Sequence, residues 1–208
     1  LRNSWLLFWI LQLSCLILSL KFNLEFIYCI LGLTGISFVY NMEPFRFKSK
    51  PGLDILSNGI SLGFLIPLAA WSIEQPLLEF PRLFFLSTIC YLLALYCPTM
   101  AIDVDFDRNF GIETFATKFG AVFTMKLSWF FTICGVLLLL YSGYFEIFPW
   151  NYELFIWTGW LLLLEIVVHY VYLPIYSKPT YNAVAKGSII LATFEAAATL
   201  MFLVIFLT

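Results

Sequence analysis

Charged residues are scarce in this sequence. Only 12% of its 208 residues are Asp, Glu, Lys or Arg, whereas 62% are hydrophobic and 20% are aromatic. Soluble domains carry about twice that charged fraction. A soluble core of this length could not hide so much apolar surface, so we expect the solvent to be lipid. The composition therefore predicts an integral, multi-pass membrane protein.

Other features are missing as well, and their absence bears on the partners, the cysteine chemistry and the processing of this protein. The sequence has no basic stripe and no charged tail, which argues against nucleic acid as a partner. Its five cysteines lie within apolar runs without a Cys-x-x-Cys pair, which indicates core residues and excludes disulfides or metal ligands. The first residue is Leu and no signal-peptide pattern follows it, so we expect the chain to begin within a longer or processed protein.

Long apolar runs occupy most of the chain. A membrane-spanning helix needs about 20 apolar residues, within a range of about 17 to 25. Seven runs approach that length: residues 4–20, 24–40, 53–71, 83–102, 121–141, 154–173 and 188–208. No linker and no convincing repeat separates them. We therefore predict an all-α bundle of about seven transmembrane helices that forms a single domain, residues 1–208.

The basic residues are divided unequally between the connectors. If the connectors alternate between the two sides of the membrane, nine of the eleven basic residues fall on one side. These nine are Arg2, Arg46, Lys48, Lys50, Arg108, Lys118, Lys126, Lys178 and Lys186. Only Lys21 and Arg82 fall on the other side. The positive-inside rule then predicts that the connectors holding Arg46 and Asp103 face the cytoplasm.

One connector holds several carboxylates. Residues 103–120 carry Asp at positions 103, 105 and 107, followed by Arg108. Asp103 and Asp107 are four residues apart, so a helical turn would place both carboxylates on one face, close enough to share a cation. Binding Mg²⁺ together with a diphosphate is the first interpretation of this segment.

Three other interpretations compete for the same segment. Alternate Asp residues also begin a calcium-binding EF-hand loop, but that loop needs Gly at its sixth position and Glu at its twelfth. Counting from Asp103, those positions hold Arg108 and Thr114, which excludes the EF-hand. A solvated acidic loop between two helices remains open, and so does a capped helix end that turns at Gly111.

A second polar connector follows residue 40. It reads Tyr-Asn-Met-Glu-Pro-Phe-Arg-Phe-Lys-Ser-Lys-Pro and leads into the next apolar run. Arg46 and Lys48 could donate hydrogen bonds to a diphosphate that lies across from the carboxylates. Asn58, at the headgroup end of its helix, could bind phosphate or metal-bound water. The alternative is an ordinary basic loop that sets the topology and contacts lipid phosphates.

Three ionisable residues interrupt the later apolar runs. Glu165 and His169 are four residues apart and would share a helix face, whereas Glu195 precedes three alanines. Function is the default hypothesis for such residues inside a membrane. A mutually satisfied Glu165–His169 pair, a tetrapyrrole ligand at His169, and an acceptor-pocket or helix-packing role for Glu195 all remain open.

The polar connectors resemble a known family. Asp-x-x-x-Asp-Arg, Gly-Ile-x-Thr and Lys-Phe-Gly, within residues 103–120, resemble the second aspartate-rich motif of the UbiA-type intramembrane prenyltransferases. Residues 40–59 resemble the family too, with Asn41 in place of a usual Ser and Glu43 in place of a usual Pro. Their wording is most similar to the carotenoid-elongating branch.

The resemblance implies a nine-helix fold around a central cavity, of which this chain matches the later part. The family's first motif, Asn-Asp-x-x-Asp, does not occur in this sequence, so we expect two preceding helices to be absent from it. The implied activity is transfer of a prenyl group from an allylic prenyl diphosphate to a lipophilic acceptor, with Mg²⁺ as cofactor and membrane lipids or a membrane complex as partners. The implied metal ligands are Asp103, Asp107 and the weaker candidate Asp105. The implied diphosphate contacts are Arg46, Lys48, Arg108 and Asn58.

Two other functions remain open at this point. A non-catalytic membrane subunit on the same scaffold could bind a pigment or an isoprenoid lipid, and Glu43 and the missing first motif favour it. A transporter is the third alternative, but no inverted repeat is evident in the sequence.

Overall fold

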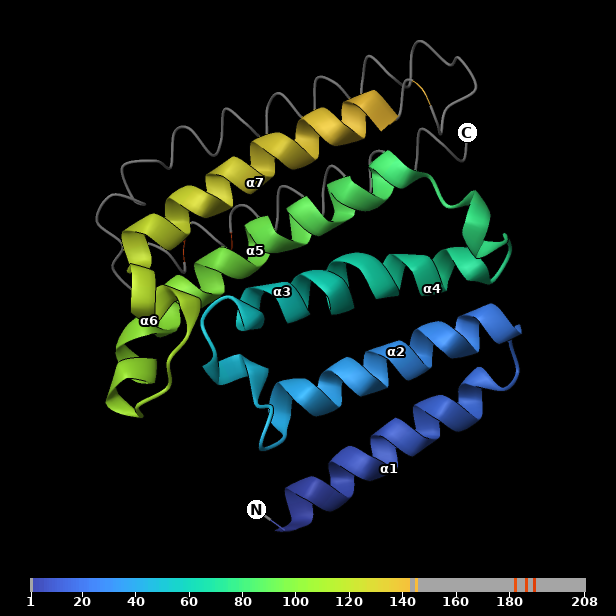
Figure 1. The fold of residues 1–208 in the computed structure, drawn as a ribbon, viewed down its shortest axis with the longest axis horizontal. Helices are drawn as coiled ribbons and strands as arrows, with labels where there is room; N and C mark the ends of the chain where they lie inside the picture. Colours follow the sequence, from blue (N-terminus) through green and yellow to red (C-terminus); the bar gives the residue numbers. More distant parts are fainter. Residues whose placement is uncertain (1, 143–144, 146–181, 183–185, 187–188, 190–208) are drawn as a thin grey trace.

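The computed structural model describes residues 2–142 together with residues 145, 182, 186 and 189. Within these residues every regular element is a helix and none is a strand, which confirms the predicted all-α class. The long helical segments lie side by side, and neighbours in the sequence run in opposite directions (Figure 1). They are α1 (Arg2–Ser19), α2 (Leu24–Asn41), a rod that contains α3 (Leu53–Ile60) and α4 (Ile66–Ser72), α5 (Arg82–Asn109) and α7 (Ala121–Ser142).

Short helical elements connect the long ones. A π-helical turn, η2 (Ser61–Leu65), joins α3 to α4 into one continuous rod, Leu53–Ser72. The 3₁₀ turns η1 (Phe47–Ser49) and η3 (Leu77–Glu79) lie in the connectors on either side of that rod. Helix α6 (Phe115–Phe119) lies between α5 and α7.

Four of the predicted spans are confirmed in length and apolarity. They are Leu24–Asn41, Leu53–Ser72, Arg82–Asn109 and Ala121–Ser142. Helix α1 forms where the first run was predicted, but its apolar part, Leu6–Ser19, is shorter than a typical span. The predicted spans 154–173 and 188–208 lie outside the described residues. The four long apolar helices make this an integral membrane protein.

Helix α5 extends beyond the apolar run that predicted it. The run ends at residue 102, whereas the helix continues to Asn109. The acidic segment 103–109 is therefore helical, and the expectation that it forms a connector is wrong for those residues. Side chains in the last turns of a membrane helix can reach water, so carboxylates there do not have to end the helix.

Interhelical contacts in the described part depend on small residues. A Cβ atom at Gly63 would lie 2.8 Å from Ile89 Cα, so only glycine allows η2 to approach α5 this closely. The Thr88 hydroxyl donates to the Gly63 carbonyl at 2.7 Å, and the Ser128 hydroxyl of α7 donates to the Ala94 carbonyl of α5 at 2.6 Å. In lipid, such close approaches and hydroxyl bonds hold helices together because hydrophobic burial between helices contributes little.

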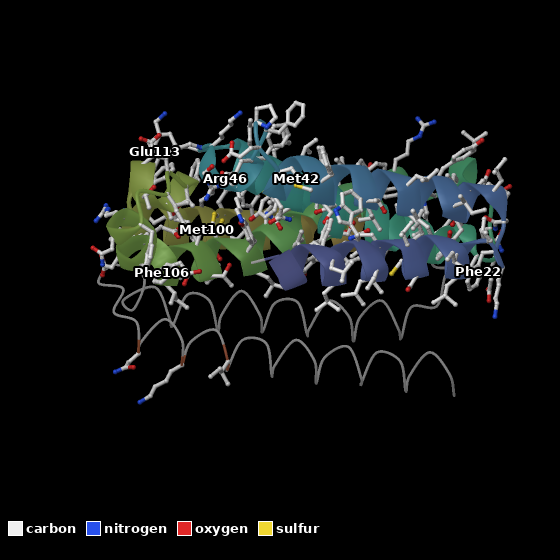
Figure 2. The ribbon with its side chains drawn as sticks, turned by 90° about the horizontal axis from the view of Figure 1, so that it is seen from below. Phe22, Met42, Arg46, Met100, Phe106 and Glu113 are labelled. Carbon is white, nitrogen blue, oxygen red and sulfur yellow. The ribbon has the colours of Figure 1, made fainter. Side chains whose placement is uncertain are left out.

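The two predicted polar connectors lie at the same end of the bundle. Figure 1 shows the α2–α3 connector and the α5–α6–α7 region at one end, and the α1–α2 and α4–α5 connectors at the other. Figure 2 shows the same division, with Arg46, Phe106 and Glu113 far from Phe22. The basic residues of these four connectors thus follow the predicted alternation, whereas Lys178 lies outside the described residues. The cytoplasmic orientation of the basic end stays a prediction.

Candidate active site

Asp54 joins two connectors that are distant in the sequence. Its side chain is buried, with 1% of its surface exposed. Oδ1 accepts hydrogen bonds from the backbone N–H groups of Gly52 (2.7 Å) and Ile55 (2.9 Å), and Oδ2 accepts one from Phe115 (2.6 Å). A buried carboxylate is costly unless hydrogen bonds compensate it, and these donors come from the starts of two helices. Asp54 therefore fastens the start of α6 to the start of α3.

Helix α6 begins with a capping box. The Thr114 hydroxyl accepts from Thr117 N–H at 3.3 Å, and the Thr117 hydroxyl accepts from Thr114 N–H at 2.8 Å. Such reciprocal bonds satisfy donors that a helix start leaves unpaired. Before this cap the chain turns at Gly111, whose φ of +64° lies in the left-handed region that glycine adopts without strain. The predicted turn at Gly111 is confirmed.

Asp107 connects this cap to α5. Its Oδ2 accepts a hydrogen bond from the Thr114 hydroxyl at 3.3 Å, and the side chain is half-buried. Asp103 lies one helical turn before it on α5. The two carboxylates of this face of α5 repel each other, which favours a cation near them.

The helical geometry separates the three predicted acidic ligands into two sets. Asp103 and Asp107, one turn apart on α5, share a face, and Asp103 is exposed. Asp105 is also exposed but points about 200° away from Asp103 around the helix. Within the described residues no three His, Cys, Asp or Glu side chains form a metal cluster. Two carboxylates still fit Mg²⁺, which proteins often hold by one or two carboxylates and substrate phosphates.

The predicted basic residues lie at the same end but contact their own connector. Arg46, at φ +38°, forms an ion pair with Glu43 at 3.0 Å, and both side chains are well exposed. The Lys48 ammonium donates to Asn41 Oδ1 at 3.4 Å. Arg108 is exposed at the end of α5. The carboxylate at position 43 therefore pairs with Arg46.

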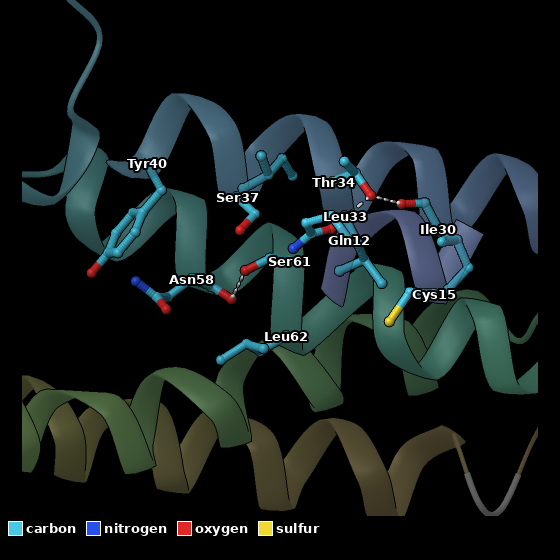
Figure 3. Close-up of a pocket in the computed structure, with 11 residues that line it drawn as sticks. Gln12, Cys15, Ile30, Leu33, Thr34, Ser37, Tyr40, Asn58, Ser61 and Leu62 are labelled. Atoms are coloured by element: carbon cyan, nitrogen blue, oxygen red, sulfur yellow. Dashed lines mark hydrogen bonds between the residues drawn. The ribbon is translucent and has the colours of Figure 1, made fainter. Parts of the chain in front are cut away.

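Asn58 lines a cavity of about 350 Å³ among α1, α2, α3 and η2 (Figure 3). Its amide nitrogen donates to the Asp54 carbonyl of the same helix at 2.8 Å. Tyr40 also lines this cavity, and its hydroxyl lies 3.1 Å from that of Tyr96 on α5. The Tyr40–Tyr96 pair therefore links the lining of the cavity to α5.

Asp54, Tyr40 and Tyr96 were not among the site residues predicted from the sequence. Asp54 had a usable signal, because an acid in the first turn of an apolar helix, after Pro51 and Gly52, needs donors to be buried there. Tyr40 and Tyr96 had no comparable signal, because aromatic residues are frequent throughout this chain. Of the other predicted candidates, Glu165, His169 and Glu195 lie outside the described residues.

A family comparison agrees with the fold and the motifs. The model of the "UbiA prenyltransferase family" matches residues 1–178. The chain therefore belongs to the UbiA prenyltransferase family.

Similar proteins refine this assignment. Two curated relatives from Humulus lupulus, "2-acylphloroglucinol 4-prenyltransferase, chloroplastic" and "2-acylphloroglucinol 4-prenyltransferase", are each 32% identical over 58% of this chain and 31% of their own length. The chain thus spans about a third of these relatives' length. Their names do not support the resemblance to the carotenoid-elongating branch.

Solved structures share the fold. The structure of a UbiA homolog from Archaeoglobus fulgidus has a TM-score of 0.64 at 21% identity, covering 97% of this chain and 72% of the other. The same homolog bound to Cd²⁺ has a TM-score of 0.66 at 21% identity, covering 95% and 71%. A likeness at this identity establishes the membrane helical fold.

Proposed function

We propose that this chain transfers a prenyl group from an allylic prenyl diphosphate to a lipophilic aromatic acceptor within the membrane. The observation that carries the proposal is the shared face of Asp103 and Asp107 on α5. The Thr114 hydroxyl bonds Asp107, and this face lies at the same end of the bundle as the connector that contains Arg46. Family membership and relatives named for an acylphloroglucinol acceptor support the reaction class and the aromatic acceptor.

Asp103 and Asp107 would hold a divalent cation, with Asp105 a weaker candidate because it lies on another face of α5. Mg²⁺ supplies charge neutralisation on the diphosphate oxygens as the carbon–oxygen bond breaks. The Thr114 hydroxyl keeps the Asp107 carboxylate oriented, and Asp54 keeps Thr114 in place through the Phe115 N–H bond. The cation bound by the solved UbiA homolog, Cd²⁺, is divalent as well.

Arg46, Lys48 and Arg108 would bind the diphosphate as it leaves. For Arg46 this requires release from Glu43, and an exposed pair of this kind is worth only about 0–1 kcal/mol. A diphosphate carries several negative charges and accepts bidentate hydrogen bonds, so it would compete well for the guanidinium. We propose that Asn58, which lines the cavity, also binds phosphate or metal-bound water. We propose as well that the connector with Arg46 faces the cytoplasm.

Replacement of the shared-face carboxylates tests this proposal. In the protein reconstituted into lipid nanodiscs, Asp103→Ala and Asp107→Ala should each reduce Mg²⁺-dependent prenyl transfer by more than about 100-fold. The reason is that the departing diphosphate would lose the metal ion that neutralises its charge. Glu113→Ala is the matched control, since Glu113 is exposed in the same region, and it should keep normal activity. Retained activity in both Asp variants would contradict the site.

A second candidate function is a non-catalytic subunit that binds a pigment or an isoprenoid lipid. The Glu43–Arg46 ion pair favours this second function, because the pair engages a guanidinium that the proposed transferase would use to bind the diphosphate. A pigment or isoprenoid that copurifies with the natural protein, together with no turnover of any prenyl diphosphate, would favour this second function over the first.

A further inference from the structure

Helix α7 has a buried face and an exposed face. It lies at the edge of the row of described helices and packs against α5 (Figure 1). The buried face carries small or polar side chains, among them Thr124, Ser128 and Thr132. The exposed side chains of the opposite face include Phe123, Lys126, Phe130, Leu137 and Tyr141. With about 3.6 residues per turn, these five lie within an arc of about 60° around the helix, which therefore faces lipid.

A charged residue interrupts this lipid-facing arc near its start. Lys126 lies in the second turn of α7, about 7.5 Å along the helix axis from Ala121, between Phe123 and Phe130 on the same face. Among the residues that the structure describes, Lys126 forms no ion pair with a carboxylate. A lysine on the lipid face of a membrane span is costly unless its ammonium reaches the headgroup layer or meets an anion. An anionic partner close to the start of α7 would satisfy Lys126.

Aromatic rings connect Lys126 to a second unpaired lysine. The ring centroids of Phe119 on α6 and Phe123 on α7 lie 6.0 Å apart, and both rings are exposed. The Lys118 ammonium lies 5.7 Å from the Phe119 centroid, a cation–π distance, and in the described part of the chain it has no carboxylate partner either. We call this surface the α6–α7 stripe; it consists of Lys118, Phe119, Phe123, Lys126, Phe130 and Leu137.

The two lysines of the stripe lie close to one membrane boundary. Phe123 and Tyr141 are about 27 Å apart along the axis of α7, close to the hydrocarbon thickness of about 30 Å. Tyrosine is typical of the membrane–water interface, so Tyr141 lies near one boundary and Phe123 near the other. Lys118 precedes the Phe123 boundary and Lys126 follows it by about one turn. Both ammonium groups can therefore reach the same headgroup layer.

We propose that the α6–α7 stripe binds an anionic phospholipid. The ammonium groups of Lys118 and Lys126 bind the lipid phosphate, and the rings of Phe119 and Phe123 cover its glycerol region. The acyl chains lie along the rest of the stripe, on the apolar side of Lys126. A zwitterionic headgroup carries a cation that these two lysines repel, so the site prefers a headgroup with net negative charge. This binding does not depend on the proposed transferase function.

Lipid titration in detergent tests the site. The probes are phosphatidylglycerol and phosphatidylcholine, each titrated onto the delipidated protein and measured by native mass spectrometry. We expect phosphatidylglycerol to bind about 10-fold more tightly. Lys118→Gln and Lys126→Gln should each weaken phosphatidylglycerol binding about fivefold, as expected for loss of one charge at the headgroup layer. Lys126→Arg keeps the charge and should keep the affinity, whereas Phe130→Ser should weaken binding of both lipids alike.

A lysine in the other connector at this end provides the matched control. Lys50 is exposed, and its ammonium lies 5.9 Å from the ring centroid of Phe47, but Phe47 belongs to a connector and not to a spanning helix. Lys50→Gln should leave phosphatidylglycerol binding unchanged. Equal binding of the two lipids, or an equal loss in Lys50→Gln and Lys126→Gln, would overturn the site. Displacement of the bound lipid by inorganic phosphate would also overturn it, because the acyl chains would then contribute nothing.

Discussion

Buried charge at a single residue, Asp54, organises the polar end of this protein. The Asp54 carboxylate accepts three backbone N–H bonds and contacts no cation among the described residues, so neutral dipoles alone compensate its charge. Helix starts are suited to this, because their N–H groups carry partial positive charge. At the residue scale, Asp54 positions other groups and would not itself touch a substrate.

The role of Asp54 predicts a specific effect of removing its charge. Asp54→Asn keeps one oxygen for Gly52 and Ile55 but presents NH₂ to the Phe115 N–H. Leaving that donor unpaired should lower the free energy of unfolding by about 1–3 kcal/mol. Segment 111–120 should also exchange its amide hydrogens faster, measured by mass spectrometry, because its link to α3 is broken.

The exposed carboxylate in the same segment provides the control for this experiment. Glu113→Gln makes the same carboxylate-to-amide change without a buried partner, and exchange in segment 111–120 should stay at the wild-type rate. If Asp54→Asn left the exchange of that segment unchanged, the Phe115 contact would have no part in holding α6.

At the scale of elements, the packing of η2 against α5 depends on the absence of a side chain. A Cβ at Gly63 would meet the Ile89 backbone at 2.8 Å and the Leu92 side chain at 3.3 Å. A clash with backbone cannot be relieved by a rotamer change, so the two helices would have to separate. Separation would also break the bond from the Thr88 hydroxyl to the Gly63 carbonyl.

Gly63→Ala should therefore destabilise the protein by about 1–3 kcal/mol, the usual cost of overpacking a well-packed contact. The measurement is reversible unfolding in mixed detergent, followed by helical circular dichroism. Gly35→Ala on α2 is the matched control, since no atom lies within 4 Å of a Cβ there, and it should be neutral or slightly stabilising. Equal stability of the two variants would show that η2 and α5 do not pack as described.

At the scale of the whole molecule, the arrangement of connectors makes a prediction about sidedness. Lys50 and Lys118 lie in the two polar connectors at one end, and Lys21 and Glu79 lie in connectors at the other end. All four are exposed. Single Cys substitutions at these positions should react with a membrane-impermeant maleimide in two groups, one from each side of the membrane.

We expect Lys50→Cys and Lys118→Cys to be labelled only from the cytoplasmic side, and Lys21→Cys and Glu79→Cys only from the opposite side. The wild-type chain, with its five native cysteines in apolar helices, measures the background. Labelling of Lys50→Cys and Lys118→Cys from different sides would contradict the fold. Labelling of both from outside would leave the fold intact and reverse its orientation.

Local properties of the chain were predictable from the sequence. Each span needs about 20 apolar residues because lipid offers the backbone no hydrogen bonds, and that requirement is written into the residues of the span itself. The shared face of Asp103 and Asp107 and the turn at Gly111 are local as well. Each follows from a spacing of four residues or from the torsion angle of one residue.

The sequence by itself thus determined the helical membrane class, four spans of this chain and the acidic face of α5. Tertiary structure alone decided which groups meet across helices: the bond from Phe115 N–H to Asp54, the Tyr40–Tyr96 pair and the cavity beside Asn58. The physical reason is that these contacts depend on how closely helices approach and how they are rotated. Those two quantities are set by small residues such as Gly63 acting on distant partners, and no periodicity along the chain encodes them.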